Sequence, residues 1–167
     1  MDNGLNFCLN KKMKTALLIS TYNWSDSLDL VLKSINSQSL FPHEILIADD
    51  GSDLQTKKLI TEFKNKSSIS IVHIWQSDNG FRKSKILNKA ILQSNSDYLL
   101  FTDGDCIPRN DFIEVHLMYR EKGYFLSGGY FKLPIGISEL ISVDHIKNQD
   151  CFKLFWLKEN GFKANFK

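Results

Sequence analysis

The chain has 167 residues, of which 43% are hydrophobic and 24% are charged, as in a globular domain that buries a sizeable core. Its formal net charge of +2 is too small to favour nucleic acid or an anionic membrane surface as a partner. No apolar run approaches the roughly 18 residues that a transmembrane segment needs. The three cysteines show no metal or disulfide spacing, so a reducing cytoplasm is the expected compartment.

Short apolar, β-prone runs alternate with helical patterns along most of the chain. Residues 1–14 form a polar leader without a signal-peptide core. The pattern after it predicts strands at 15–20, 44–48, 68–75, 97–102 and 124–133, and helices at 25–38 (with Ser25 as N-cap), 54–65, 83–93 and 111–122. This alternation predicts an α/β domain over residues 15–133, with a mainly parallel sheet flanked by helices on both faces.

The last segment, residues 134–167, has a different pattern. Amphipathic spacing predicts one helix from about Ser138 to Glu159, with Phe152, Phe155 and Trp156 on one face. Three roles are open for these aromatic side chains: lining an acceptor site, peripheral contact with a membrane, or packing beneath a further segment, which we favour. Exposure of such an apolar face would promote self-association.

Four polar clusters follow four of the predicted strands. They are STYN at 20–23, DDGS at 49–52, QSDNGFRKSK at 76–85 and TDGD at 102–105. The carboxyl ends of parallel strands meet at one edge of the sheet, where α/β domains bind ligands. Each cluster alone is explained by a turn or a helix cap, and Asp49 is expected to cap its turn or to orient its neighbour. The prediction of a site therefore rests on their common placement.

The TDGD cluster places two carboxylates two residues apart. In extended backbone, residues at this spacing point the same way, so Asp103 and Asp105 would repel each other unless they are solvated or share a cation. Carboxylate oxygens are natural ligands of hard divalent cations. Gly104 between them would let a phosphate approach closely.

The four clusters, read with the sequence around them, resemble a known enzyme family. The segments LLISTYNWSDSLDLVLKSINSQSLFPHEILIADDGSDLQT, DNGFRKSKILNKAI and DYLLFTDGDCIPRNDFI resemble family 2 glycosyltransferases of the GT-A fold, especially bacterial polysaccharide and capsule-type members. The resemblance covers about residues 15–133. It implies a GT-A, Rossmann-like sheet that is truncated on the acceptor side, and a nucleotide-sugar donor.

The resemblance also implies roles for individual residues. Ser20 and Tyr22 would contact the base and ribose of a uridine nucleotide, and Asp50 would accept the uracil N3–H. An aromatic ring and a carboxylate suit these contacts chemically. Asp103 would contact ribose or metal-bound water, and it would share Mn²⁺ or Mg²⁺ with Asp105, the main metal ligand.

The segment GFRKSKILNKAI supplies positive charge. Arg82, Lys85 and Lys89 fall on one helical stripe, which in most proteins is simply a solvated face. Here the first turn follows a strand and points toward the predicted site, and a helix N-terminus attracts anions. The resemblance therefore assigns Arg82, and with it Lys85, to the donor phosphates or sugar, while Lys89 is expected to lie in solvent.

The implied activity is metal-dependent, inverting transfer of a sugar from a UDP-linked donor to a glycan acceptor, in the cytoplasm or at the inner face of the membrane. Inversion needs a base on the acceptor side, and no matching acidic motif follows TDGD. The base is therefore expected beyond Lys167, in a longer enzyme. Two alternatives stay open. One is a nucleotidyltransferase that makes nucleotide sugars, although STYNWSDS lacks the glycine-rich loop of those enzymes, and the other is a non-catalytic module that binds a nucleotide sugar.

Overall fold

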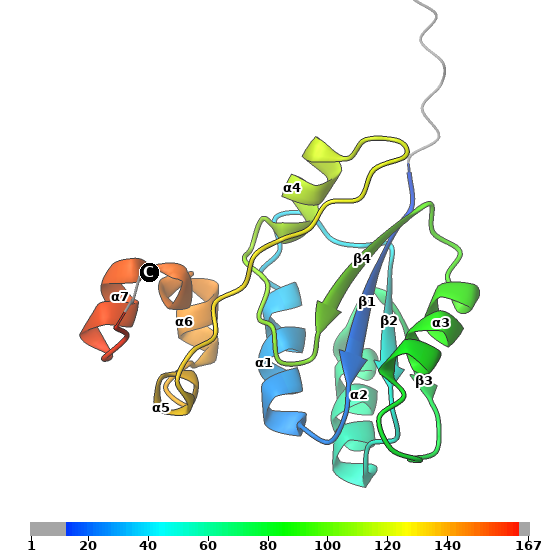
Figure 1. The fold of residues 1–167 in the computed structure, drawn as a ribbon, viewed down its shortest axis with the longest axis horizontal. Helices are drawn as coiled ribbons and strands as arrows, with labels where there is room; N and C mark the ends of the chain where they lie inside the picture. The colour runs from blue at the N-terminus through cyan, green and yellow to red at the C-terminus, as the bar shows by residue number, and fades with distance from the viewer. Residues whose placement is uncertain (1–12, 164–167) are drawn as a thin grey trace, which may run out of the picture.

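The computed structural model describes residues 13–163, so most of the predicted leader and the last four positions of the chain lie outside the described part. The first four predicted strands are confirmed as β1 (Thr15–Thr21), β2 (Glu44–Asp49), β3 (Ser70–Trp75) and β4 (Tyr98–Asp103). They form a fully parallel sheet in the order β3-β2-β1-β4 (Figure 1).

Helices cover both faces of this sheet, as predicted. On one face lie α1 (Ser25–Ile35), α2 (Leu54–Lys66) and α4 (Phe112–Tyr119), and on the other lies α3 (Lys83–Gln93) (Figure 1). Alternate residues of the central strands enter the two cores, so Leu17 packs with the first group of helices and Leu18 packs with α3. Burial on both faces explains why β1 is a continuous apolar run rather than an alternating one.

The connection through α3 creates the crevice of the fold. The chain adds β2 and β3 on one side of β1, and then crosses back so that β4 pairs with the other side of β1. The strand order thus reverses between β1 and β4, which is where ligands bind in open α/β sheets. The register places Ser20 directly beside Asp103 at this point.

The predicted fifth strand at 124–133 is wrong. Within the described residues, the chain between Arg120 and Pro134 forms no strand, and it runs from α4 past the outside of α1 (Figure 1). Gly128 and Gly129 lack side chains that could pack on a sheet, and the neighbouring aromatic side chains are exposed. Helix α4 also ends early, at Tyr119, because Arg120 adopts extended backbone.

The predicted helix at 138–159 is also wrong as a single element. The segment forms α5 (Ile135–Ser138), α6 (Val143–Lys147), a 3₁₀ turn (Asp150–Phe152) and α7 (Leu154–Glu159). Ser142 begins α6 as a separate helix with a capping box. Gln149 interrupts the helical backbone a second time, because it has a left-handed φ of 58°.

These short helices enclose a third small core. Ile146 and Cys151 pack there with Leu30 of α1 and with Trp156, whereas Phe155 is 73% exposed. Within residues 13–163, no helix combines the length and apolarity needed to cross a bilayer.

Candidate functional site

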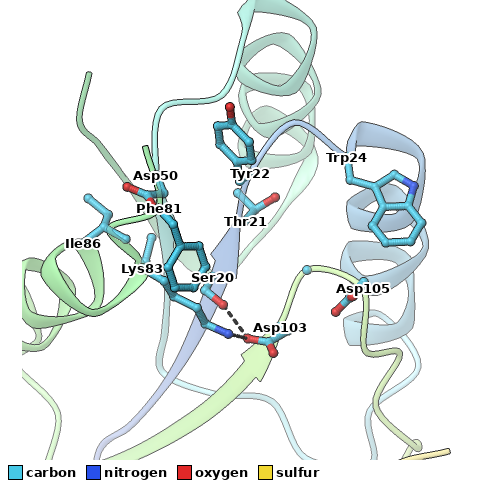
Figure 2. Close-up of a pocket in the computed structure, with 12 residues that line it drawn as sticks. Ser20, Thr21, Tyr22, Trp24, Asp50, Phe81, Lys83, Ile86, Asp103 and Asp105 are labelled. Carbon is cyan, nitrogen blue, oxygen red and sulfur yellow. Dashed lines mark hydrogen bonds and ion pairs between the residues drawn. The ribbon is translucent and has the colours of Figure 1, made fainter. Parts of the chain in front are cut away.

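A pocket of about 210 Å³ opens at the carboxyl edge of the sheet, over the point where the strand order reverses. It brings together residues from the ends of β1, β2 and β4 and from the start of α3 (Figure 2). The lining residues are Ser20, Thr21, Tyr22, Trp24, Ala48, Asp50, Phe81, Lys83, Ile86, Asp103, Gly104 and Asp105. Five of the seven predicted site residues therefore meet in one place.

Asp103 is held from two sides. Its Oδ1 accepts a 2.6 Å hydrogen bond from the Ser20 hydroxyl and also contacts the Lys83 ammonium (Figure 2). Burial by itself would raise the pKa of Asp103, but the bonds from Lys83 and Ser20 outweigh it and leave the pKa below its ordinary value. Asp103 is therefore a carboxylate at neutral pH.

Asp105 lies on the exposed side of the same turn. Ligand atoms of Asp103, Asp105 and Cys106 lie within 4.8 Å of one another. Burial, and then the Asp105 carboxylate, raise the pKa of the Cys106 thiol to about 11, so it stays protonated at neutral pH. The anionic ligands of this cluster are thus the two carboxylates.

Gly104 has a packing reason that the sequence did not reveal. Its N–H donates to the Ser20 carbonyl at 2.7 Å, which ties the end of β4 to β1. A Cβ at this position would lie 3.0 Å from that carbonyl oxygen and 3.1 Å from Thr21 Oγ1. The glycine therefore permits close approach of two strand ends, whatever ligand lies above them.

Asp49 caps the turn after β2, which is one of the two roles that the sequence left open for it. Its side chain is fully buried and accepts from Ser52 N at 2.8 Å, from Gly51 N at 3.2 Å, and from His73 Nε2 at 2.9 Å. Burial alone would raise the pKa of Asp49. The bonds from His73 and Ser52 lower it by more than burial raises it, so the pKa lies below its ordinary value. His73 accordingly has a structural partner outside the pocket.

Replacing Asp49 by asparagine is expected to destabilise the fold by about 1–3 kcal/mol near neutral pH, because an amide cannot satisfy all three donors. A carboxylate with a lowered folded-state pKa stabilises above its unfolded value of 3.8, and this stabilisation is lost as pH falls through the folded value. Urea unfolding at about pH 7 and about pH 3 should therefore show a deficit of the variant that shrinks in acid. An equal deficit at both pH values would contradict the role of the charge.

Asp50 faces the pocket with a fixed carboxylate. It is 5% exposed, and it accepts from Gln76 Nε2 at 2.5 Å and from the Arg82 backbone N–H at 2.6 Å. Sequence reasoning missed Gln76, although its place directly after β3, opposite DDGS, was a usable signal. The two donors hold Asp50 in place before any ligand arrives.

Aromatic side chains surround the mouth of the pocket (Figure 2). The Tyr22 hydroxyl donates to Asp78 Oδ2 at 2.8 Å, and this bond, followed by the negative charge of Asp78, raises the pKa of Tyr22. Trp24 and Phe81 also line the pocket, and Phe81 is 89% exposed. Sequence reasoning missed both, because exposed aromatic residues beside a motif were the only signal.

The predicted basic residues, Arg82 and Lys85, do not line the pocket. The Arg82 guanidinium bonds the Ser77 carbonyl outside the set of lining residues, and its Nε is buried without a partner among the described residues. Lys85 is exposed on α3, also outside the pocket wall. The structure brings Lys83 to the pocket instead. Sequence reasoning passed over it, although Lys83 lies three residues before the buried Ile86 and so on the same side of α3.

A comparison with known protein families identifies the family of this chain. A family model described as "Glycosyl transferase family 2" matches residues 16–164. The chain belongs to glycosyltransferase family 2. The resemblance seen in the strand-end motifs is thereby confirmed.

Two curated relatives illustrate the family. Chondroitin synthase of Pasteurella multocida (strain Pm70) is 26% identical over 110 residues, which cover 65% of this chain and 11% of that protein. Poly-beta-1,6-N-acetyl-D-glucosamine synthase of Staphylococcus aureus (strain MSSA476) is 30% identical over 115 residues, which cover 64% of this chain and 27% of that protein. The chain thus spans between about a tenth and a quarter of the length of these two family 2 relatives.

Solved structures confirm the fold. Staphylococcus aureus TarS in complex with UDP-GlcNAc superposes with a TM-score of 0.54 and 25% identity, covering 64% of this chain and 30% of that one. The mannosyltransferase PcManGT of Pyrobaculum calidifontis gives a TM-score of 0.58 at 16% identity, covering 66% and 33%. This family 2 chain therefore has the GT-A glycosyltransferase fold that its sequence predicts.

Proposed function

We propose that residues 15–133 bind the donor of a glycosyltransferase that moves a sugar from a UDP-linked donor to a glycan acceptor, with inversion. The observation that carries this proposal is the meeting of Ser20, Tyr22, Asp50, Asp103 and Asp105 around one pocket at the reversal of the sheet. The UDP-GlcNAc complex of TarS supports a uridine donor, and the polysaccharide synthases among the relatives support a glycan acceptor. Residues 134–163 would belong to the acceptor side.

Asp50 would recognise the base. Its two oxygens each accept one protein hydrogen bond and each keep a lone pair, so the fixed carboxylate is ready to accept the uracil N3–H. The Tyr22 ring, anchored through its hydroxyl to Asp78, offers a flat neighbour for a base. Adenine presents a ring nitrogen acceptor at the corresponding edge, which a carboxylate repels.

The acidic turn fits a divalent cation. Asp103 and Asp105 supply carboxylate oxygens, which Mg²⁺ and Mn²⁺ prefer, while the protonated Cys106 thiol does not compete for the ion. Asp105 and Asp103 would hold the cation, and when bound it would neutralise charge that develops on the departing diphosphate.

Protein groups would help the cation to neutralise the charge of the departing diphosphate. The Ser20 hydroxyl holds Asp103 in its orientation, and the N-terminus of α3 presents its positive end beside Lys83 at the pocket. The Arg82 guanidinium, whose Nε has no partner among residues 13–163, would turn from the Ser77 carbonyl toward a donor phosphate or sugar. These groups would bind and orient the donor so that the sugar carbon faces the acceptor side.

Calorimetry with UDP and ADP, in Mn²⁺ and in EDTA, tests the proposal. The parent protein should bind UDP in Mn²⁺, more tightly than ADP, and lose most of this affinity in EDTA. Asp50→Asn should weaken UDP binding roughly tenfold or more, since a charged hydrogen bond contributes on the order of 1.5–3 kcal/mol.

Glu62→Gln on α2 is the matched control, because it removes one exposed carboxylate away from the pocket wall. It should bind UDP like the parent. Equal affinity of the parent for ADP and UDP would overturn the assignment of Asp50 to the base.

A further inference from the structure

Lys83 contacts one of the two carboxylates that are proposed to hold the cation. Its ammonium pairs with Oδ1 of Asp103, the same oxygen that accepts from Ser20, and the two side chains of the pair are partly exposed, at 35% and 46%. Within the described residues, Oδ2 of Asp103 accepts no hydrogen bond, and Asp105 has no ion pair. The protein itself thus supplies one positive charge to the acidic turn.

We propose that the Lys83 ammonium occupies the place of the divalent cation beside Asp103 until nucleotide and cation bind together. Lys83 then leaves Asp103 and pairs with the donor diphosphate, and we call this its placeholder role. The inference rests on the proposed function, and it assigns to Lys83 a role that neither the motif nor the helical stripe indicated.

Charge explains why Lys83 would have to move. A divalent cation shared by Asp103 and Asp105 would come within a few ångströms of the Lys83 ammonium, and the two positive charges repel each other strongly at that range. The lysine side chain is long and flexible, and it lines the same pocket as both carboxylates. It can therefore change partners without moving α3.

A new partner for Lys83 appears only with the nucleotide. The diphosphate offers oxygens that accept charge-assisted hydrogen bonds, which replace the bond to Asp103. Without nucleotide, a cation must displace Lys83 with no compensation, so it binds weakly. With nucleotide, the displaced ammonium is re-paired, and cation and donor favour each other's binding. Lys83 thus makes cation and nucleotide bind cooperatively.

Two binding measurements on Lys83→Gln test this idea. The first is Mn²⁺ affinity of the nucleotide-free protein, read from the electron paramagnetic resonance signal of free Mn²⁺. It should tighten roughly three- to tenfold, because the competing ammonium is gone. The second is UDP affinity at saturating Mn²⁺, measured by calorimetry. It should weaken roughly tenfold or more, because a charged bond to the diphosphate is lost.

Lys89→Gln is the matched control, since it removes the same charge six residues further along α3, away from the pocket wall. It should change neither affinity appreciably, and Lys83→Arg should keep UDP affinity closer to the parent. Thermal unfolding should be nearly unchanged in Lys83→Gln, because the pair is partly exposed.

The opposite direction of the two effects is decisive. If Lys83→Gln and Lys89→Gln bind Mn²⁺ equally without UDP, or if Lys83→Gln leaves UDP affinity intact, the placeholder role is overturned while the donor site stands. If the parent binds no Mn²⁺ even with UDP, the proposed function fails, and the role of Lys83 fails with it.

Discussion

Replacing Asp105 by asparagine is expected to reduce cation-dependent UDP binding by about a hundredfold or more. The amide keeps the shape of the side chain but removes the charge that a hard cation requires. A bound metal contributes several kcal/mol of charge stabilisation at a phosphate, which corresponds to at least this change in affinity. Calorimetry with UDP in Mn²⁺ measures the effect directly.

Cys106→Ala provides the neighbouring control for Asp105→Asn. The thiol lies in the same acidic cluster, but its raised pKa of about 11 keeps it protonated and unsuited to bind Mn²⁺ at neutral pH. The alanine variant should therefore bind UDP like the parent. If Asp105→Asn retained parental UDP affinity in Mn²⁺, the metal role of this carboxylate would be excluded.

The sheet could be predicted from the sequence because its signals are local. A strand covered on both faces, such as β1, must be apolar at every position, and the helices that cover it must be apolar at helical spacing. The segment at 124–133 shows the limit of this reasoning. Its aromatic residues favour a strand, but a strand needs a partner and a covering layer, and neither is a property of the segment itself.

The site was predictable for a related reason. Parallel strands fix which end of each strand carries the ligand edge, so Ser20, Asp50 and Asp103 could be brought together without knowledge of any side-chain conformation. The rotation of α3 about its axis was not accessible in this way. It decides that Lys83, rather than Arg82 or Lys85, faces the pocket, and it follows from how Ile86 and Ala90 pack beneath β1 and β2.

Replacing Gly51, in the turn after β2, by alanine is expected to give a large loss of stability. Gly51 has a φ of +103°, and an added Cβ would lie 2.6 Å from the backbone nitrogen of Asp78. Backbone strain of this kind costs on the order of 1–3 kcal/mol, and the clash with another backbone segment adds to it. The melting temperature should fall by roughly 6–12 °C for a domain of this size.

Two other glycines separate the causes of this loss. Gly80 has a φ of +79°, but an added Cβ there would meet no atom within 4 Å, whereas Gly128 has neither a positive φ nor a close neighbour. Gly80→Ala should therefore show the cost of backbone strain alone, and Gly128→Ala should melt close to the parent. The difference between Gly51→Ala and Gly80→Ala then measures the clash, and equal melting temperatures for these two variants would contradict it.

The clash at Gly51 should also weaken binding of the nucleotide. Asp78 anchors the Tyr22 hydroxyl, so a shift of the Asp78 backbone would release the ring that we assign to the base. At a temperature where the variant is still folded, Gly51→Ala should bind UDP several-fold more weakly than Gly128→Ala, since about 1 kcal/mol is a factor of roughly five in affinity. Parental UDP affinity in a folded Gly51→Ala protein would show that Tyr22 does not need Asp78 to hold the donor.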